Sequence, residues 1–221
     1  MVKQTFLNLA EEKRQRILEV AMEEFATHKY SKASLTSIVS RAGISKGSIY
    51  QYFEDKKDLF VHLLEIAAQE KIAYINQALN PQADFFTAME QSIIASVKFM
   101  RDHPKMSRVI ANAMEPSGDE VLEELNNKGR QMSLEFFEKL LSQGEQEGII
   151  RADVDIRFAA YMTSAIMGSG LADYLLDHLG ISVKDYLSDP EPANKITQEM
   201  LDYVTSEIGK FLRSGLGKKG S

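Results

Sequence analysis

The sequence predicts an all-α protein of about nine helices. Apolar residues recur at the three- and four-residue intervals of amphipathic helices along most of the 221 residues. No stretch alternates apolar and polar residues as a half-buried strand would. Pro, Gly, Asp and Ser stand at the breaks in the pattern, where helices begin or end.

Composition narrows the chemistry that the chain supports. Hydrophobic residues make up 44% and charged residues 26%, which fits a soluble globular protein with a true core. The absence of cysteine excludes disulfides, zinc–thiolate sites and thiol catalysis, and it fits a reducing cytoplasm. There is no apolar run of 18 or more residues and no secretory signal core, so we expect a cytoplasmic protein that does not cross a membrane.

Four helices are expected in the N-terminal part. They run from about Leu9 to Thr27, from Leu35 to Ala42, from Lys46 to Phe53, and from Lys56 to about Leu79. Ser34 and Ser45 directly precede the second and third helices, where a hydroxyl oxygen accepts a bond from a free helical N–H. Gly43 follows the second helix at once, because glycine leaves a helix with positive φ at little cost.

Five further helices are expected in the remainder. They run from Phe85 (capped by Asp84) to about Asp102, from Lys105 to Met114, from Glu120 to about Gly144, from a cap at Asp153 or Asp155 to about Leu179, and from Ile196 to Leu212. Proline-containing segments at 116–119 and 190–192 are expected to be loops. The glycine- and lysine-rich end of the chain is expected to be flexible.

The stretch from Leu35 to Leu59 has the pattern of a helix–turn–helix. Ile49 and Phe53 are four residues apart and are expected to face inward together. Lys46, Ser48, Tyr50 and Gln51 then point outward from the second helix of the motif. Hydrogen-bonding and aromatic side chains at the start of a helix after a tight turn suit a DNA major groove.

Charge is distributed unevenly along the chain. The net charge is −6, but residues 1–58 hold ten Lys or Arg against eight Asp or Glu, while the rest holds sixteen against twenty-four. A slightly basic head on an acidic body is expected when only one end meets phosphate. A chance scatter of surface charge is the alternative explanation.

The N-terminal motif as a whole resembles the DNA-binding domain of the tetracycline-repressor (TetR) family over residues 9 to 60, about a quarter of the chain. The residues that carry the resemblance are Arg16-Ile17-Leu18, Ala21, Phe25, Tyr30, Ile38, Ala42-Gly43-Ile44-Ser45-Lys46-Gly47, Ile49-Tyr50, Tyr52-Phe53, Lys56 and Leu59. The chain departs from the family at Lys29, where Gly is usual, and at Val39, where Ala is commoner. A residue other than Gly at position 29 either adopts a strained left-handed conformation or closes the turn differently.

The resemblance implies a helix–turn–helix DNA-binding domain at residues 1–55, a ligand-binding and dimerisation domain at 56–215, and a flexible tail at 216–221. It implies DNA contacts from the second and third helices and from the start of the fourth, namely Ser34, Thr36, Ser37, Ser45, Lys46, Gly47, Ser48, Tyr50, Gln51, Tyr52 and Lys56. Lys46 and Gln51 are the candidates for base edges, while Tyr52 and Lys56 are candidates for phosphate. Tyr50 or Tyr52 could instead pack in the small core of this domain.

The same resemblance implies a small apolar or aromatic effector held among the middle helices. The candidate ligand-binding residues form a Met- and Phe-rich set: Met89, Ile93, Phe99, Met100, Ile110, Met114, Met132, Phe136, Tyr161 and Met162. Met occurs often at adaptable apolar sites. For any one of these residues, a place in the ordinary core is the favoured explanation, and only the set as a whole suggests an apolar ligand.

A homodimer built from the last two long helices is also implied. Two sets of residues fit such an interface: small residues at Ala159, Ala160, Ala165, Gly168, Gly170 and Ala172, and an apolar stripe at Ile196, Met200, Tyr203, Val204, Ile208 and Phe211. Packing of both sets inside one subunit is the competing interpretation.

The sequence therefore favours a homodimeric transcriptional repressor that an apolar effector releases from a pseudo-palindromic double-stranded DNA operator. The alternative is a helical carrier or enzyme for an apolar molecule. No catalytic residue, metal site or cofactor is predicted, because none of the four His pairs with another at i, i+4 and no phosphate loop, nucleophile elbow or dinucleotide fingerprint occurs.

Overall fold

Helices make up the whole fold, as predicted. The computed structural model describes residues 2–114, 120–182, 185 and 195–217, and an isolated bridge is the sole β pairing among them. The helices are α1 (Gln4–Leu7), α2 (Glu11–Thr27), α3 (Leu35–Ala42), α4 (Lys46–Tyr52), α5 (Lys56–Ala78), α6 (Phe85–Asp102), α7 (Pro104–Met114), α8 (Glu120–Gln146), α9 (Ile156–Ala165), the π-helical segment η1 (Ile166–Gly170), α10 (Leu171–His178) and α12 (Gln198–Leu216). None of these described helices combines the length and hydropathy of a membrane span.

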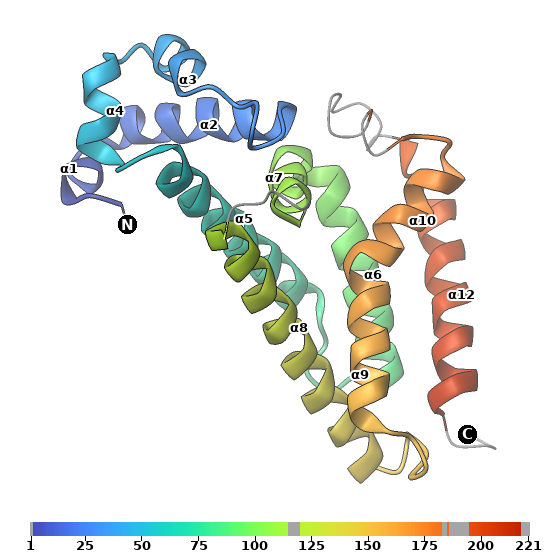
Figure 1. The fold of residues 1–221 in the computed structure, drawn as a ribbon. Helices are drawn as coiled ribbons and strands as arrows, with labels where there is room; N and C mark the ends of the chain where they lie inside the picture. The colour runs from blue at the N-terminus through green and yellow to red at the C-terminus, as the bar shows by residue number, and fades with distance from the viewer. Residues whose placement is uncertain (1, 115–119, 183–184, 186–194, 218–221) are drawn as a thin grey trace.

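Figure 1 shows α1 to α4 gathered as a head at one end of the molecule. Helix α5 leaves this head and runs down into the body, where it contacts α6 and α7. In the body, α12 packs on α6, and α9 packs along α8. The N-terminus lies at the head, while the last described residues lie at the far end of the body.

A single apolar core fills the head and continues into the body. Its centre comprises fully buried residues from α2, α3, α4 and α5, among them Ile17, Phe25, Ile38, Ile49, Leu59 and Phe60. Val109 of α7 belongs to the same core. The proposed domain boundary between residues 55 and 56 falls at Asp55, the N-cap of α5, although the core itself crosses it.

Several helix boundaries differ from the prediction. The first long helix begins at Glu11 rather than Leu9, and the short helix α1, which was not predicted, precedes it. The helix capped by Asp155 is interrupted by η1. The segments 115–119 and 186–194, which contain the two predicted proline loops, lie outside the described residues.

The chain end is also ordered further than predicted. Helix α12 ends at Leu216 rather than at Leu212. Gly217 pairs with Ile150 in the isolated bridge, and the Arg151 N–H donates to the Leu216 carbonyl at 3.0 Å. The first two residues of the predicted tail, 216 and 217, thus have backbone partners in the loop after α8.

The turn after α2 explains how the chain tolerates Lys29. His28 ends α2 with an extended conformation (φ −120°), and no described residue other than Gly has a positive φ. The turn then closes through a bond from the Lys32 N–H to the Lys29 carbonyl at 2.9 Å. The chain therefore closes the turn differently, and Lys29 bears no left-handed strain.

Helix α7 ties the body to the head. The buried amide of Asn112 donates to the carbonyls of Phe25 (2.7 Å) and His28 (3.4 Å), which lie at the C-terminal end of α2. At the other end of α7, the Lys105 ammonium lies 3.5 Å from the Glu23 carboxylate of α2. The two bonds from Asn112 satisfy carbonyls at the end of α2 that have no intrahelical partner.

Replacement of Asn112 tests this attachment. Asn112→Ala removes both donated bonds from a buried site, so we expect the free energy of unfolding in urea to fall by about 1–3 kcal/mol. The matched control is Asn127→Ala, at an exposed position of α8, which should change stability by less than about 0.5 kcal/mol. Equal effects of the two substitutions would contradict the role given to Asn112.

Candidate nucleic-acid interface

The turn between α3 and α4 is rigid. Gly43 adopts the left-handed conformation (φ +69°), and the Ile44 N–H bonds back to the Val39 carbonyl at 3.0 Å. Beyond the turn, Ile49 and Phe53 are each 1% exposed and anchor α4 to the head core. The predicted glycine turn and the predicted inward pair are both confirmed.

Serine caps begin both helices of the motif. Ser34 Oγ accepts from the Ser37 N–H at 3.3 Å, and Ser45 Oγ accepts from the Ser48 N–H at 3.1 Å. The Ser45 and Ser48 hydroxyls also bond to each other at 2.7 Å. Ser34 and Thr36 are exposed at the start of α3. The predicted caps are confirmed, and the capping hydroxyls also lie near the outer surface of the motif.

A buried carboxylate holds α3 in place. Glu24 of α2 accepts from the Ser34 N–H at 2.9 Å and from the Ser37 hydroxyl at 2.8 Å, and Arg41 lies 3.5 Å away. The Ser37 hydroxyl is thus engaged inside the head. Glu24 was not among the predicted site residues, although its position three residues after the buried Ala21 places it on the inner face of α2.

The outer face of α4 presents four different groups to solvent. Lys46, Gly47, Tyr50 and Gln51 are exposed, and Ser48 is half-buried beside them. Tyr50 is 46% exposed, so its ring is not part of the core. The face therefore offers an ammonium, a phenol, a carboxamide and an accessible stretch of backbone on one short helix.

Tyr52 does not share this surface. Its side chain is 6% exposed, and its ring lies 5.8 Å from that of Phe6 in the head core. Tyr52 was predicted to contact phosphate, but its side chain is buried. It lies on the inner side of α4, beside Ile49 and Phe53.

Lys56 is likewise occupied within the head. Its ammonium donates to the carbonyls of Tyr30 (2.8 Å) and Ala33 (3.2 Å) in the loop between α2 and α3, and it lies 4.7 Å from the centre of the Tyr30 ring. In this structure Lys56 joins the start of α5 to that loop. A contact between Lys56 and phosphate, as predicted, would have to form while these hydrogen bonds are kept.

The structure does not gather the ten predicted ligand-binding residues into one site. Met89, Ile93 and Phe99 of α6 are buried in the body, and Met100 and Ile110 are half-buried. The other five are 43–64% exposed, namely Met114, Met132, Phe136, Tyr161 and Met162. These five lie on outer helix faces, which periodicity alone does not distinguish from inner ones.

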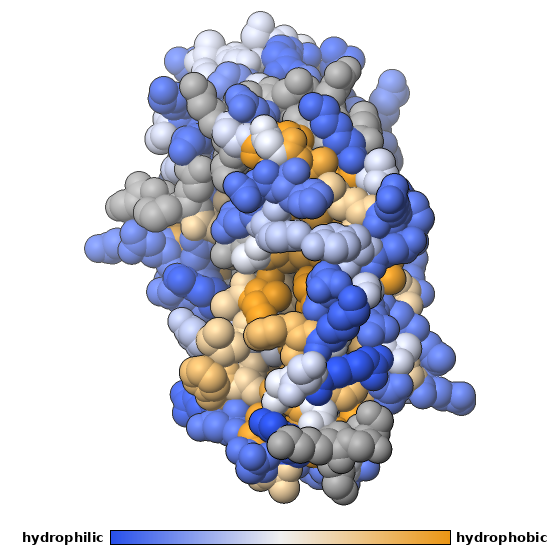
Figure 2. Space-filling model, turned by 90° about the vertical axis from the view of Figure 1, so that its right-hand side faces the viewer, coloured by the Kyte–Doolittle hydropathy of each residue, from blue (hydrophilic) through white to orange (hydrophobic). Residues whose placement is uncertain are grey.

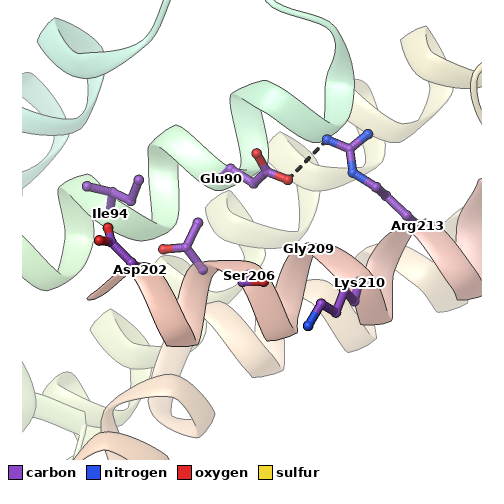
Figure 3. A pocket seen from close by; sticks show the side chains of 8 residues that line it. Glu90, Ile94, Asp202, Ser206, Gly209, Lys210 and Arg213 are labelled. Carbon is purple, nitrogen blue, oxygen red and sulfur yellow. Dashed lines mark hydrogen bonds and ion pairs between the residues drawn. The ribbon is translucent and has the colours of Figure 1, made fainter. Parts of the chain in front are cut away.

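A shallow open groove lies between α6 and α12 (Figure 3). It is lined by Glu90, Ile94, Asp202, Thr205, Ser206, Gly209, Lys210 and Arg213, and none of these is a predicted ligand residue. Arg213 bridges the groove to Glu90 at 3.0 Å. Gly209 allows the close approach, because a Cβ there would lie 2.8 Å from the Glu90 carboxylate.

Three groups on α5 have shifted pKa values, and burial lowers the pKa of the first of them, His62. Burial lowers the pKa of Lys71, which is half-buried on the helix. Further along, the Tyr74 hydroxyl donates to Asp102 at 2.6 Å, and this bond raises the pKa of Tyr74. Arg101 and Tyr74 both donate to Asp102 and lower the pKa of its carboxyl. No cluster of three or more His, Cys, Asp or Glu suited to a metal ion occurs among the described residues.

Large apolar side chains are exposed along α9, α10 and α12. They are Phe158, Tyr161, Met162, Tyr174, Tyr203 and Phe211, each 43–64% exposed. Figure 2 shows the side of the molecule to which α12 belongs, with an apolar area along its middle. Exposed apolar surface of this extent on a folded chain is typical of an interaction site.

Some residues of the two sets predicted for the dimer interface are buried within the subunit, and others are exposed on its surface. Ile196 and Val204 of the stripe are 4% and 3% exposed and pack inside the subunit, whereas Tyr203 and Phe211 face solvent. Ala159 and Ala160 are also buried within the subunit, and Ala165 and Gly170 are exposed. Intramolecular packing on α6 and α8 accounts for the buried members.

Comparison with known proteins agrees with this arrangement. Residues 17–63 match the family model described as bacterial regulatory proteins, tetR family. The HTH-type transcriptional regulator SAR2658 of Staphylococcus aureus (strain MRSA252) is 25% identical over 179 residues, covering 80% of this chain and 89% of that protein. The HTH-type transcriptional repressor BepR of Brucella suis biovar 1 is 28% identical over 181 residues, covering 79% and 86%.

Solved structures share the fold. A TetR family transcriptional regulator from Chloroflexus aurantiacus aligns with a TM-score of 0.77 and 27% identity, over 99% of this chain and 100% of that one. Two more distant structures, each 18% identical, are complexes with small molecules. One is a SmeT–triclosan complex (TM-score 0.69, 95% and 94% covered), and the other is FadR from Bacillus subtilis with stearoyl-CoA (TM-score 0.63, 87% and 97% covered).

The family match coincides with the helix–turn–helix, and the similarity to regulators continues through the helical body. Residues 17–63 therefore match the tetR family of bacterial regulatory proteins, and the chain as a whole is similar to transcriptional regulators of that family.

Proposed function

We propose that this regulator binds double-stranded DNA as a homodimer and that an apolar small molecule releases it from a pseudo-palindromic operator. The observation that carries the proposal is the outer face of α4, where Lys46, Tyr50 and Gln51 extend into solvent from a helix fixed by a rigid turn. A short helix presented in this way fits the major groove with its first turns toward the base edges.

Each outward group has a proposed role. Lys46 reaches guanine or phosphate, Gln51 pairs with adenine, and Tyr50 contacts the sugar–phosphate backbone or a thymine methyl. Ser34, Thr36, Ser37, Ser45 and Ser48 are assigned to supporting contacts with phosphate. Ser37 and Ser48 would contribute while retaining their bonds to Glu24 and Ser45.

Gly47 supports a close approach of DNA to the backbone. Glycine inside a helix costs about 1 kcal/mol relative to alanine. Apart from its chain neighbours and its own helix, a Cβ at this position would meet only Ser45 Oγ, at 3.9 Å, so packing within the protein does not require glycine. Close approach of DNA to α4 from outside would explain why the position holds glycine.

The exposed apolar face is assigned to the second subunit. Phe158 and Phe211 are each 64% exposed on α9 and α12, and burial of such rings at about 25 cal/mol per Å² favours association. A two-fold dimer would hold two copies of α4 at a fixed spacing, which matches the symmetry of a palindromic site.

The effector is assigned to the apolar interior of the body, around the buried residues Met89, Ile93 and Phe99 of α6. The ligands of the two distant structures, triclosan and stearoyl-CoA, both have large apolar parts. An effector that binds better to a conformer with wrongly spaced heads weakens DNA binding by linkage, typically by about 1–3 kcal/mol. A regulator that acts on DNA in this way works in the cytoplasm.

The comparisons favour this function over the helical carrier or enzyme that the sequence left as an alternative. The relatives covering about four fifths of the chain are named as transcriptional regulators or repressors. We therefore take the apolar interior as a regulatory site that serves the DNA-binding head.

Selection of DNA fragments by the purified protein, followed by gel shifts at several salt concentrations, tests DNA binding. We expect a two-fold symmetric site whose affinity falls steeply with salt. Lys46→Ala should weaken binding and reduce the salt slope by about one, and Gln51→Ala should cost about 1–3 kcal/mol and relax the base preference.

Lys139→Ala is the matched control for Lys46→Ala, since Lys139 is exposed on α8 in the body. It should leave affinity and salt slope unchanged. Failure of the wild-type protein to select any DNA sequence, with or without triclosan or stearoyl-CoA as probe ligands, would refute the proposed function.

Dimerisation is tested by Phe211→Asp in sedimentation at micromolar concentration. The substitution places a charge in the proposed interface but disturbs little within the subunit, because Phe211 is 64% exposed. We expect the wild type to sediment as a dimer and the variant as a monomer. The control Ile72→Asp, at a 51% exposed apolar position on α5, should remain dimeric, and a Phe211→Asp dimer would contradict the assigned face.

A further inference from the structure

The short helix α1 packs directly on α4. It spans Gln4–Leu7 and lies before the residues that match the family model, which begin at Ile17. In Figure 1, α1 sits at the outer end of the head beside α4. None of the roles assigned above uses this element.

The N-terminal segment, residues 3–7, supplies hydrogen-bond donors to backbone carbonyls of α4 that have no donor within the helix. The last four carbonyls of a helix have no intrahelical donor, and in α4 these belong to residues 49–52. The first of them accepts from the Phe53 N–H at 2.9 Å. The Tyr50 carbonyl accepts from the Lys3 ammonium at 2.9 Å, and the Tyr52 carbonyl accepts from the Lys3 N–H at 3.0 Å.

The remaining carbonyl, that of Gln51, accepts from the Thr5 hydroxyl. Two residues of the N-terminal segment thus complete the C-terminal end of α4. The positive charge of Lys3 is also favourable at this end, where the helix dipole is negative.

Apolar packing fixes the segment itself. Phe6 is fully buried, with its ring 4.8 Å from that of Phe53 and 6.1 Å from that of His62 on α5. Arg14 of α2 donates to the Leu7 carbonyl at 3.0 Å. The segment is therefore anchored to α2 and α5 while it holds the end of α4.

The bonds from Lys3 and Thr5 hold the part of α4 that presents side chains for the proposed DNA recognition. Tyr50 and Gln51 are the residues whose carbonyls are held, and their side chains are the outward ones. A helix of seven residues does not keep its last turn in water without external support. Holding these carbonyls fixes the backbone angles that aim the two side chains.

We propose that Lys3 and Thr5 are positioning residues that hold the C-terminal turn of the recognition helix α4 in the conformation that reads DNA. The inference rests on the proposed DNA binding by α4. It extends the recognition machinery to the N-terminal segment, which acts through backbone carbonyls rather than through contact with bases.

Thr5→Val is the cleanest test, because it removes the hydroxyl and keeps size and charge. We expect faster amide hydrogen exchange at the end of α4 in the free protein. We also expect the affinity for the selected DNA to fall roughly three- to tenfold, the effect of one lost hydrogen bond. Affinity for unrelated DNA should change less than twofold, so that the specificity ratio falls.

Lys3→Met should act in the same direction, and Lys3→Arg, which keeps a charged donor, should behave close to wild type. Thr27→Val is the control, at an exposed position in the last turn of α2; it should leave exchange in α4 and the specificity ratio unchanged. Unchanged exchange in Thr5→Val and Lys3→Met, or an equal loss of specific and unspecific binding, would overturn the inference.

The two proposals fail differently. If the wild type selects no DNA, the proposed function is refuted, while exchange in the free protein still decides whether Lys3 and Thr5 hold α4. If the wild type binds its site and both variants match it in affinity and specificity, the positioning role alone is refuted.

Discussion

A helix as short as α4 does not hold its own shape in water, and the head of this protein is organised around that constraint. Ser45 caps its start, Gly43 sets its direction, and Ile49 and Phe53 fasten its inner side. The N-terminal segment then supplies donors to its free carbonyls. The backbone of α4 is thus held from both ends, so in the proposed complex with DNA little free energy would be needed to order it.

The C-terminal half of α2 connects this head to the body. Its Glu24 holds the start of α3, while Asn112 of α7 holds its last carbonyls. Glu23 lies 3.0 Å from Arg41 of α3 and 3.5 Å from Lys105 of α7. A shift of α7 in the body would therefore act on α2 and α3 together, which would give the proposed effector a physical route to the spacing of the two heads in the proposed dimer.

Local patterns predicted much of the fold. The caps at Ser34, Ser45 and Asp84 follow from the chemistry of helix starts, and the turn at Gly43 follows from the freedom of glycine. These features depend only on a few neighbouring residues, so they can be predicted from the sequence. The helix α1 was missed because it has four residues and owes its stability to Phe6 packing on distant partners.

The differences between the predicted and the observed surroundings of the site residues have one physical origin. Periodicity says which side chains share a helix face, but it does not say what covers that face. Tyr52 and Lys56 were predicted as phosphate contacts from their positions. In the structure Tyr52 packs on the ring of Phe6, and Lys56 donates to carbonyls of the α2–α3 loop. Met132 and Met89 look alike in sequence, and tertiary packing alone separates the 61% exposed one from the buried one.

The measurement that tests the central claim most directly is methylation interference and hydroxyl-radical footprinting on the DNA selected by the wild-type protein. We expect two symmetric half-sites on one face of the duplex, with interference at major-groove guanines and a spacing set by the helical repeat. Loss of interference at those guanines in Lys46→Ala would place α4 on them. Protection without interference in the major groove, or a single asymmetric contact, would contradict the claim that a dimer reads DNA through α4.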